Sequence, residues 1–390
     1  MNTAFCAGAI CAVLTVVNLI SIGLAVVRLR RSDRLPPPSG PAEPVTVVRP
    51  VCGLEPFLEE TLASGFALDH PEYELVFCAE HQDDPAVEVV RRLMAAYPEI
   101  AARLLVGVDR ISGNPKLNNC AKGWEAARHD WVVLADSNVL MPPDCIQRLM
   151  SSWRPDTGLV CSPPLGARPC GFWAEVECAF LNTFQARWQY AAEGAGLGFA
   201  QGKSMLWRRG LLEAKGGIRA LAAEAAEDAA ATKLVRGAGL RVRLVDAPFE
   251  QPLGRRGARQ VWTRQARWAR LRRATFPAHF APEILSSAAL LLAAGSYAAA
   301  AGGKSVPAVA ATLLVLWYGA EAALARSKGW HLSWRLPLAC LVRDCLIPPM
   351  WVCGWTSGKT VWRGKAMEVR SAGGNQQPSQ PTPDAAAAPL

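Results

Sequence analysis

The chain has 390 residues, a net charge of +9 and 51% hydrophobic residues. This is enough apolar material for one sizeable core and several membrane segments, which excludes a small domain held together by disulfides. The 12 cysteines form no C-x-x-C pair and have no histidine partners at zinc spacing, so we expect reduced packing residues. No recognisable nucleic-acid module accompanies the positive charge, so we expect no nucleic-acid partner.

The N-terminal region is an uncharged apolar run from Ala4 to Val27, long enough to cross a bilayer as a helix. The sequence "RLRRSDR" follows it, which indicates that its C-terminal end faces the cytoplasm. A cleaved signal peptide is the alternative, but it would carry its charges before a shorter apolar run. We therefore expect a membrane anchor at 1–34, followed by a stiff Pro-rich linker at 35–44.

A soluble domain is expected over residues 45–280. Three β-branched apolar runs, "VTVVRPV", "YELVFCAE" and "DWVVLADSN", alternate with helical stretches. This alternation predicts an α/β fold with a parallel, doubly wound sheet. Ligands in such a fold bind beyond the carboxyl ends of the strands.

Acidic residues follow two of these predicted strands. Asp83 and Asp84 follow the second run, and Asp136 and Asn138 follow the third. Oxygens two residues apart at a strand end can reach one divalent cation, because alternate side chains point in one direction and hard cations prefer oxygen. The alternative is that these residues only form turns, in which Asp and Asn are common.

An Ala-rich helix is predicted around "AEDAAATKLVRGAGLRV", with Glu227 and Asp228 adjacent near its start. Acidic residues there can be a solvated helix face that opposes the helix dipole. The other interpretation makes one of them a general base, which geometry must decide.

The segment at 170–200 mixes aromatic residues with few charges, and fits either a core helix or an amphipathic helix at a lipid entrance.

The C-terminal membrane region is expected at 281–370, with apolar segments at 284–302, 307–325 and 336–355. The third contains Arg343, Asp344 and two prolines, which suit a re-entrant or interface-lying hairpin better than a lipid-facing span. The basic loop "RSKGWHLSWR" indicates a cytoplasmic side for the soluble domain. Residues 371–390 have the composition of a disordered tail.

The order of the motifs resembles the ceramide glucosyltransferases, a family-21-like group of membrane-bound glycosyltransferases. The matching stretches are "RPVCGLEP", "DDPA", "GNPKLNN" with "ADSNVLMPPD", "AEDAAATKLVRGAGLRV" and "RQARW". The last fits the [Q/R]-x-x-R-W box of that family through Arg264, Arg267 and Trp268. The resemblance implies an α/β GT-A fold, a doubly wound sheet with one N-terminal and two to three C-terminal membrane helices.

The resemblance also implies an activity, the inverting transfer of glucose from UDP-glucose to the primary hydroxyl of ceramide. It implies Mg²⁺ or Mn²⁺ on the UDP diphosphate, bound by Asp136, with Asn138 in place of a second acid. Asp228 would be the general base. The implied nucleotide-sugar site comprises Glu55, Asp83, Asp84, Lys116, Asn119, Asp136, Arg264, Arg267 and Trp268. Lys116 is explained equally well as a solvated loop residue.

The stretch from Val261 to Pro277 would then be an active-site lid at the membrane surface. Its outer arginines, Arg270, Arg272 and Arg273, would bind anionic lipids. A packed core tryptophan is the alternative for Trp268. We expect an integral membrane protein of a bacterial inner membrane.

Three other functions remain open at this point. The acceptor could be another lipid, such as a hopanoid or diacylglycerol, or the sugar could differ. A processive polysaccharide synthase would share these motifs, but it needs more spanning helices to line a pore. A binding protein that lost catalysis would lack the acids that are present here.

Overall fold

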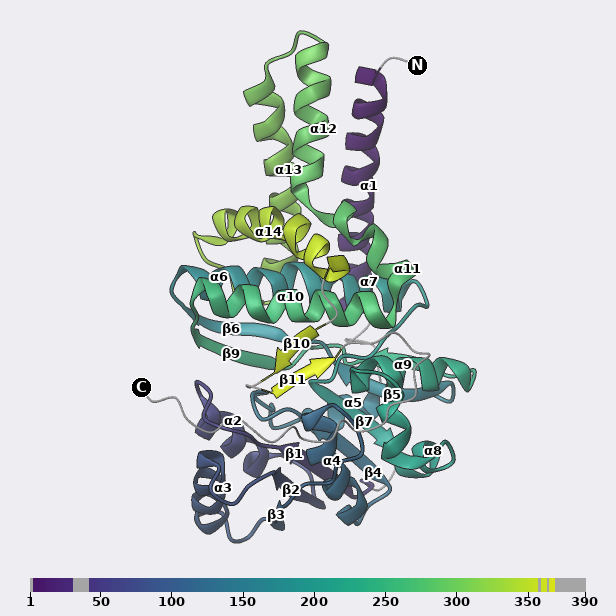
Figure 1. Cartoon of the computed structure of the whole chain (residues 1–390), viewed down its shortest axis with the longest axis vertical. Coiled ribbons are helices and arrows are strands. Elements are labelled where there is room, and N and C mark those ends of the chain that lie inside the picture. Colours follow the sequence, from purple (N-terminus) through teal and green to yellow (C-terminus); the bar gives the residue numbers. More distant parts are fainter. Residues whose placement is uncertain (1–2, 31–41, 357–358, 363–364, 369–390) are drawn as a thin grey trace.

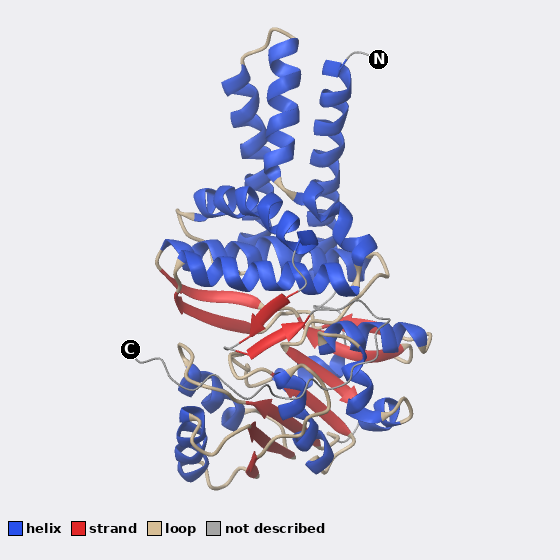
Figure 2. Ribbon diagram, viewed as in Figure 1, coloured by secondary structure: helices blue, strands red, loops and turns tan. Residues whose placement is uncertain are grey.

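The computed structural model describes residues 3–30, 42–356, 359–362 and 365–368. A sheet domain lies at one end, a layer of helices crosses its top, and three helices project from that layer (Figures 1 and 2). Most of the expected linker at 35–44 and all of the expected tail at 371–390 lie outside the described residues.

The central sheet has seven strands. They are β1 (Val45–Pro50), β2 (Tyr73–Ala79), β3 (Ala102–Val106), β4 (Trp131–Ala135), β5 (Thr157–Ser162), β7 (Ser204–Arg208) and β8 (Arg241–Leu244). Their order is β3-β2-β1-β4-β7-β5-β8, which confirms the predicted α/β fold.

One strand departs from the expected parallel arrangement. β7 is antiparallel to both β4 and β5, and its first residue, Ser204, pairs with Ala135 at the end of β4. The chain therefore enters β7 from the carboxyl edge of the sheet. As a result, the loop just before β7 lies beside the acidic residues that follow β4.

Helices α3 (Pro85–Ala96) and α4 (Pro115–Ala126) begin at the same edge. Asp84 and Asn114 each precede a helix and accept a hydrogen bond from an N–H group of its first turn. Proline at the first helical position adds a preset backbone angle and has no N–H to satisfy. Local sequence thus fixes the first residue of both helices. It therefore also fixes the positions of the side chains in their first turns, which lie at the carboxyl edge of the sheet.

The domain is completed by α2 (Leu58–Ala63), η2 (Ser64–Ala67), α5 (Cys145–Ser151), α8 (Arg209–Glu213), η4 (Gly217–Ala223) and α9 (Glu227–Gly237). Two apolar clusters fill the two faces of the sheet, because alternate strand residues point to opposite sides. Val48 of β1 packs in one cluster with Trp124 and Trp207, whereas Val47 packs in the other with Phe77.

A helical layer lies between the sheet domain and the projecting helices (Figure 1). It consists of a parallel strand pair and the helices that cover it. Its elements are β6 (Leu165–Cys170), β9 (Glu250–Arg255), α6 (Phe172–Ala179), the π-helical segment η3 (Phe180–Ala186), α7 (Arg187–Gly194), α10 (Ala258–Thr275), α11 (Pro277–Phe280) and η5 (Ala281–Ser286). The segment at 170–200 is therefore largely helical, and its central turns are buried.

The remaining elements are α1 (Thr3–Arg30), α12 (Ala288–Ala301), α13 (Val306–Ser327), α14 (Leu336–Thr356), β10 (Lys359–Trp362) and β11 (Lys365–Glu368). Among the described residues, α1, α13 and α14 each contain a stretch long and apolar enough to cross a membrane. A fourth crossing would need the segment formed by α11 and η5 together with α12, and these two parts meet at an angle of 51°. All 12 cysteines are free in the structure.

Helix α14 lies across the direction of α1, α12 and α13 and packs against α10 and α6 (Figure 1). Its charged pair does not face outward. Arg343 is fully buried, 2.9 Å from Glu321 of α13 and 2.7 Å from Asp344. The orientation favours the interface-lying alternative for this segment, and the ion pairs explain how an apolar helix carries two charges.

We expect Arg343→Met to lower the free energy of unfolding by about 3–5 kcal/mol. The buried Asp344 would lose its ion-pair partner, and Glu321 would keep only the guanidinium of Arg187, at 3.7 Å. Thermal unfolding in detergent measures this change. The control is Arg326→Met, at an exposed position on the last turn of α13. Equal stability of the two variants would contradict a role for the buried ion pairs.

Candidate active site

The loop after β4 is held by one buried arginine. Arg49 of β1 donates hydrogen bonds to the carbonyls of Asp136, Ser137 and Val139, at 3.0, 3.3 and 2.9 Å. Burial lowers the pKa of Arg49 to about 10, so it is charged at neutral pH. A planar guanidinium with five donors can hold several carbonyls at once. Arg49 thereby fixes the backbone of the loop that carries Asp136.

The Asp136 carboxylate is paired with two lysines. Lys116 of α4 lies 2.6 Å from one oxygen, and Lys203, just before β7, lies 2.8 Å from the other. Burial opposes the charge, but the two ammonium groups hold the pKa of Asp136 well below its usual value. Asp136 is therefore an anion at any physiological pH.

Lys116 also joins Asp136 to α9. Its ammonium lies 2.7 Å from Glu227 and donates to the Gly202 carbonyl. Asn114, which caps α4, donates to the other oxygen of Glu227 at 2.7 Å. Burial would lower the pKa of Lys116, yet Asp136 and Glu227 raise it well above its usual value. Lys116 is thus a central cation of the site and not a solvated loop residue.

Asp228, the predicted base, lies beside this cluster. Its carboxylate accepts hydrogen bonds from the N–H groups of Gly202, at 3.1 Å, and Ala229, at 2.8 Å. Burial and the neighbouring charge of Glu227 raise the pKa of Asp228 to about 6. The adjacent acids therefore differ: Glu227 is engaged with Lys116, whereas Asp228 can gain or lose a proton near neutral pH.

Gly202 is a position in this cluster that the sequence did not single out. Its carbonyl binds Lys116 and its N–H binds Asp228, so it links both halves of the site. A Cβ at this position would lie 2.5 Å from a Glu227 oxygen and 2.9 Å from the Lys116 ammonium. Only glycine lets the backbone pass this closely.

The two predicted cation ligands do converge. The Lys203 ammonium, 2.8 Å from an Asp136 oxygen, is also 3.3 Å from the Asn138 amide oxygen, so both oxygens face one positive group. Glu55 accepts from the Asn138 amide nitrogen at 2.9 Å. Within the described ranges, no three His, Cys, Asp or Glu side chains form a complete metal cage.

The acidic pair after β2 lies in a different setting. Asp84 accepts from the N–H of Gly53, at 2.8 and 3.0 Å, in addition to capping α3. Asp84 therefore anchors the loop that follows β1, and this loop contains Glu55. Asp83 is exposed. Asn119 is buried and accepts from Lys122 at 2.8 Å, so its amide is engaged on its own helix.

The R-x-x-R-W stretch lies on α10, across the top of the sheet domain (Figure 1). Arg264 forms an ion pair of 2.8 Å with the buried Glu177 of α6, which also pairs with Arg256 at 3.3 Å. Trp268 is half-buried against Cys178, Leu181 and Leu253, which is the packed alternative. Arg267, one turn after Arg264, is half-buried.

Two of the three outer arginines of α10 have partners within the part of the chain that the structure describes. Arg272 forms an ion pair of 2.5 Å with Glu283, and the Arg273 guanidinium lies 5.2 Å from the centre of the Trp355 ring. These two contacts hold α10 against η5 and α14. The binding of anionic lipids by the outer arginines stays a prediction, and Arg272 and Arg273 also have this structural role.

Together these side chains can hold an anion and accept a proton. Two ammonium groups face the carboxyl edge beside a carboxylate with a pKa near neutrality. That combination suits a reaction in which a negatively charged group leaves while a hydroxyl is deprotonated.

A family model supports this interpretation. The model described as glycosyl transferase family 21 matches residues 13–375. The chain belongs to this family. The resemblance seen in the sequence motifs is thereby confirmed, and with it the predicted class of glycosyltransferase.

The chain is similar in sequence to several ceramide glucosyltransferases. Ceramide glucosyltransferase 1 of Caenorhabditis elegans is 29% identical over 267 residues, covering 68% of this chain and 57% of that protein. Ceramide glucosyltransferase of Komagataella phaffii is 38% identical over 110 residues, covering 27% of this chain and 22% of that protein. The chain thus spans little more than half the length of the first of these curated relatives.

Among solved structures, a mannosyltransferase from Pyrobaculum calidifontis in complex with GDP-Man and Mn²⁺ is 21% identical, with a TM-score of 0.48. The alignment covers 90% of this chain and 99% of that chain.

We expect Gly202→Ala to lower the free energy of unfolding by about 1–3 kcal/mol, because the added methyl would displace Glu227 or Lys116 in a packed site. Unfolding by heat or denaturant measures it. Gly210→Ala is the matched control, since a Cβ there meets nothing within 4 Å. Identical stabilities would show that the loop adjusts freely.

Proposed function

We propose that this protein transfers glucose from UDP-glucose to the primary hydroxyl of ceramide, with inversion at the sugar. The observation that carries the proposal is the contrast within one cluster: Asp228 has a pKa near 6, while Asp136 is held as an anion by two lysines. Family membership supports glycosyl transfer. The names of the relatives support glucose and ceramide as the substrates.

On the donor side, Lys116 and Lys203 supply positive charge for the diphosphate that leaves. Asp136 and Asn138, whose oxygens both face the Lys203 ammonium, would hold a divalent cation, Mg²⁺ or Mn²⁺. When bound, such a cation neutralises charge on the leaving diphosphate. Lys203 would then turn from Asp136 toward the phosphates.

On the acceptor side, Asp228 removes the proton from the lipid hydroxyl. The hydroxyl oxygen forms a bond to the anomeric carbon as the bond from that carbon to the diphosphate oxygen breaks. A single displacement inverts the anomeric centre. Glu227 stays paired with Lys116, and its charge helps keep the pKa of Asp228 high enough to accept a proton.

Helix α10 would close the donor site from the membrane side. Arg267 has a planar fork that suits a diphosphate, and Arg264 is held by Glu177 beside it. The basic residues that follow α1 and α13 support a cytoplasmic location for the sheet domain. The same site would serve another hexose or another lipid hydroxyl, which makes these the rival substrates.

The direct test of the proposed function is a panel of UDP-sugars assayed with purified protein and defined lipids. The lipids are ceramide, diacylglycerol and a hopanoid. We expect glucosylceramide from UDP-glucose and ceramide. Exclusive transfer to a different lipid would move the acceptor assignment, and no transfer to any lipid would contradict the proposal.

Asp228→Asn should leave UDP affinity nearly unchanged and lower the transfer rate by about 10²-fold or more, since only proton removal is lost. In the unmodified protein the rate should fall as pH drops below about 6, where Asp228 becomes protonated, and level off above it. Asp130→Asn, at an exposed position, is the control. A variant with normal turnover would place the base elsewhere.

Asp136→Ala should remove the gain in UDP affinity that Mg²⁺ or Mn²⁺ provides, because the protein would lose its charged ligand to the cation. Calorimetric titration of UDP with and without Mn²⁺ measures the gain, and Asp130→Ala is the control. A preserved gain would put the cation at another residue, and EDTA-insensitive transfer by the unmodified protein would argue against any cation.

A further inference from the structure

The loop between α13 and α14, residues 328–335, holds two large apolar side chains in the open. Trp334 is 85% exposed, more than any other large apolar side chain in the described part of the chain, and Leu332 is 42% exposed. Beside a membrane segment, tryptophan is typical of the headgroup level, because its ring is apolar while its N–H can reach water or a lipid oxygen. The loop therefore has the side chains of a membrane-surface contact.

Two contacts fix the loop near its start. Trp330 is 4% exposed and belongs to the same apolar cluster as Ala325 of α13. The Nε2 atom of His331 lies 3.0 Å from a carboxylate oxygen of Glu175 on α6. These residues anchor the chain four and three positions before Trp334, so the ring of Trp334 projects from a backbone that the protein holds in place.

The loop lies at the junction of the projecting helices and the helical layer. It follows α13, which contains a stretch long and apolar enough to cross a membrane, and precedes α14, which lies across the direction of α13 (Figure 1). The outer face of α14 continues the apolar surface: Leu338, Cys345 and Val352 are exposed and seven residues apart, about two turns, so they share one face. Arg343 and Asp344 are fully buried on the other side. An apolar exposed face on a helix beside the membrane segments indicates contact with hydrocarbon.

Positive charge surrounds the exposed tryptophan. Residues 322–343 contain no Asp or Glu, and three of their basic residues, Arg326, Lys328 and Arg335, lie in or beside the loop. Arg326 is exposed, and the Arg335 guanidinium lies 5.1 Å from the centre of the Trp334 ring. Within the described ranges, neither Arg326 nor Arg335 pairs with a carboxylate. Guanidinium groups bind phosphate with paired hydrogen bonds, and an anionic bilayer surface attracts them.

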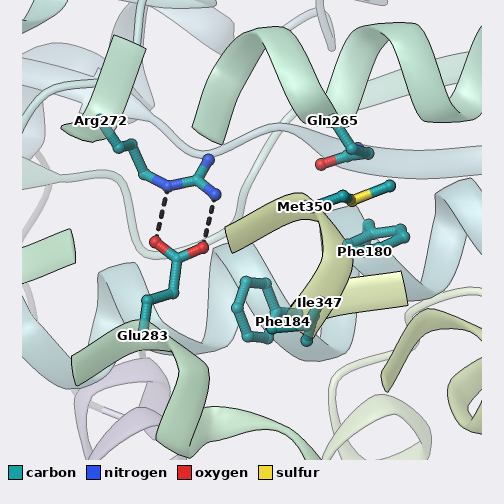
Figure 3. Close-up of a pocket in the computed structure, with 7 residues that line it drawn as sticks. All are labelled: Phe180, Phe184, Gln265, Arg272, Glu283, Ile347 and Met350. Carbon is teal, nitrogen blue, oxygen red and sulfur yellow. Dashed lines mark hydrogen bonds and ion pairs between the residues drawn. The ribbon is translucent and has the colours of Figure 1, made fainter. Parts of the chain in front are cut away.

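The outer arginines of α10, which are also predicted to bind anionic lipids, differ in this respect. Figure 3 shows Arg272 directed toward Glu283, with which it forms an ion pair of 2.5 Å. The Arg273 guanidinium lies over the ring of Trp355. A phosphate at these arginines would compete with contacts that hold α10 in place. At the loop between α13 and α14, no carboxylate of the described residues competes with a phosphate for the two arginines.

We propose that the loop at 328–335, with Arg326 beside it, binds the headgroup of an anionic phospholipid. The Arg326 and Arg335 guanidinium groups contact the lipid phosphate, while Trp334 and Leu332 enter the boundary between headgroups and hydrocarbon. The apolar face of α14 then lies in the outer part of the acyl region. This contact sets the depth of α14 in the membrane, and of α10, which packs against it. None of these residues belongs to the proposed catalytic site, so the inference does not depend on which sugar or lipid is transferred.

The first test identifies what Trp334 contacts. The full chain, with the photoreactive residue p-benzoylphenylalanine in place of Trp334, is reconstituted in nanodiscs of phosphatidylcholine and phosphatidylglycerol and irradiated. We expect crosslinks to phospholipid, detected by mass spectrometry. The same residue in place of Val106, which is 40% exposed at the end of β3, should give no lipid crosslink. Crosslinks from position 334 to a second protein chain, or no crosslink to lipid, would overturn the proposal.

The second test measures the contribution of charge with the double variant Arg326→Gln and Arg335→Gln. Binding of a fluorescent phosphatidylglycerol is titrated in neutral detergent micelles across a salt series. Each arginine contributes about fivefold in affinity near an anionic headgroup, so we expect a loss of about 25-fold at low salt that shrinks as salt rises. Arg91→Gln with Arg110→Gln, at exposed positions of the sheet domain, is the matched control, and thermal unfolding in detergent checks that both double variants are folded. Equal affinity of these two variants for phosphatidylglycerol would contradict the phosphate contact.

Discussion

The near-complete burial of Lys116, whose side chain is 15% exposed, is the constraint on which the site depends. An ammonium group removed from water needs compensating negative charge, and here it comes from Asp136 on one side and Glu227 on the other. This requirement draws α4, the loop after β4 and the start of α9 together. It also separates two neighbouring acids, because Glu227 is engaged and Asp228 keeps its capacity to take up a proton.

A second set of charges couples this site to the membrane helices. Glu177 of α6 holds Arg264 of α10 and Arg256, which directly follows β9, while Glu321 of α13 holds Arg343 of α14. In each case a buried carboxylate fixes a basic residue from another element. Since α14 packs against α10, these pairs connect the projecting helices to the top of the sheet domain through one continuous helical layer.

The sequence predicted the features that depend on local pattern. Strand-end acids, the Ala-rich helix and the apolar segments follow from periodicity and turn chemistry, and Asp136 and Asp228 do lie on the same edge of the sheet. Contacts between distant segments were beyond such patterns: Asn114 and Glu227 are 113 positions apart. The antiparallel entry of β7 was also missed, and with it the roles of Gly202 and Lys203.

The crossing of α14 over the axes of the projecting helices has a consequence for how substrate arrives. If α1 and α13 stand upright in a bilayer, α14 and α10 run parallel to its surface. They then form a layer between the bilayer and the sheet domain (Figure 1). The height of Asp136 and Asp228 above that surface is then set by the thickness of this helical layer. Under the proposed function, an acceptor lipid would need to raise only its polar end and could keep its tails in the hydrocarbon, while the water-soluble donor would arrive from the opposite side.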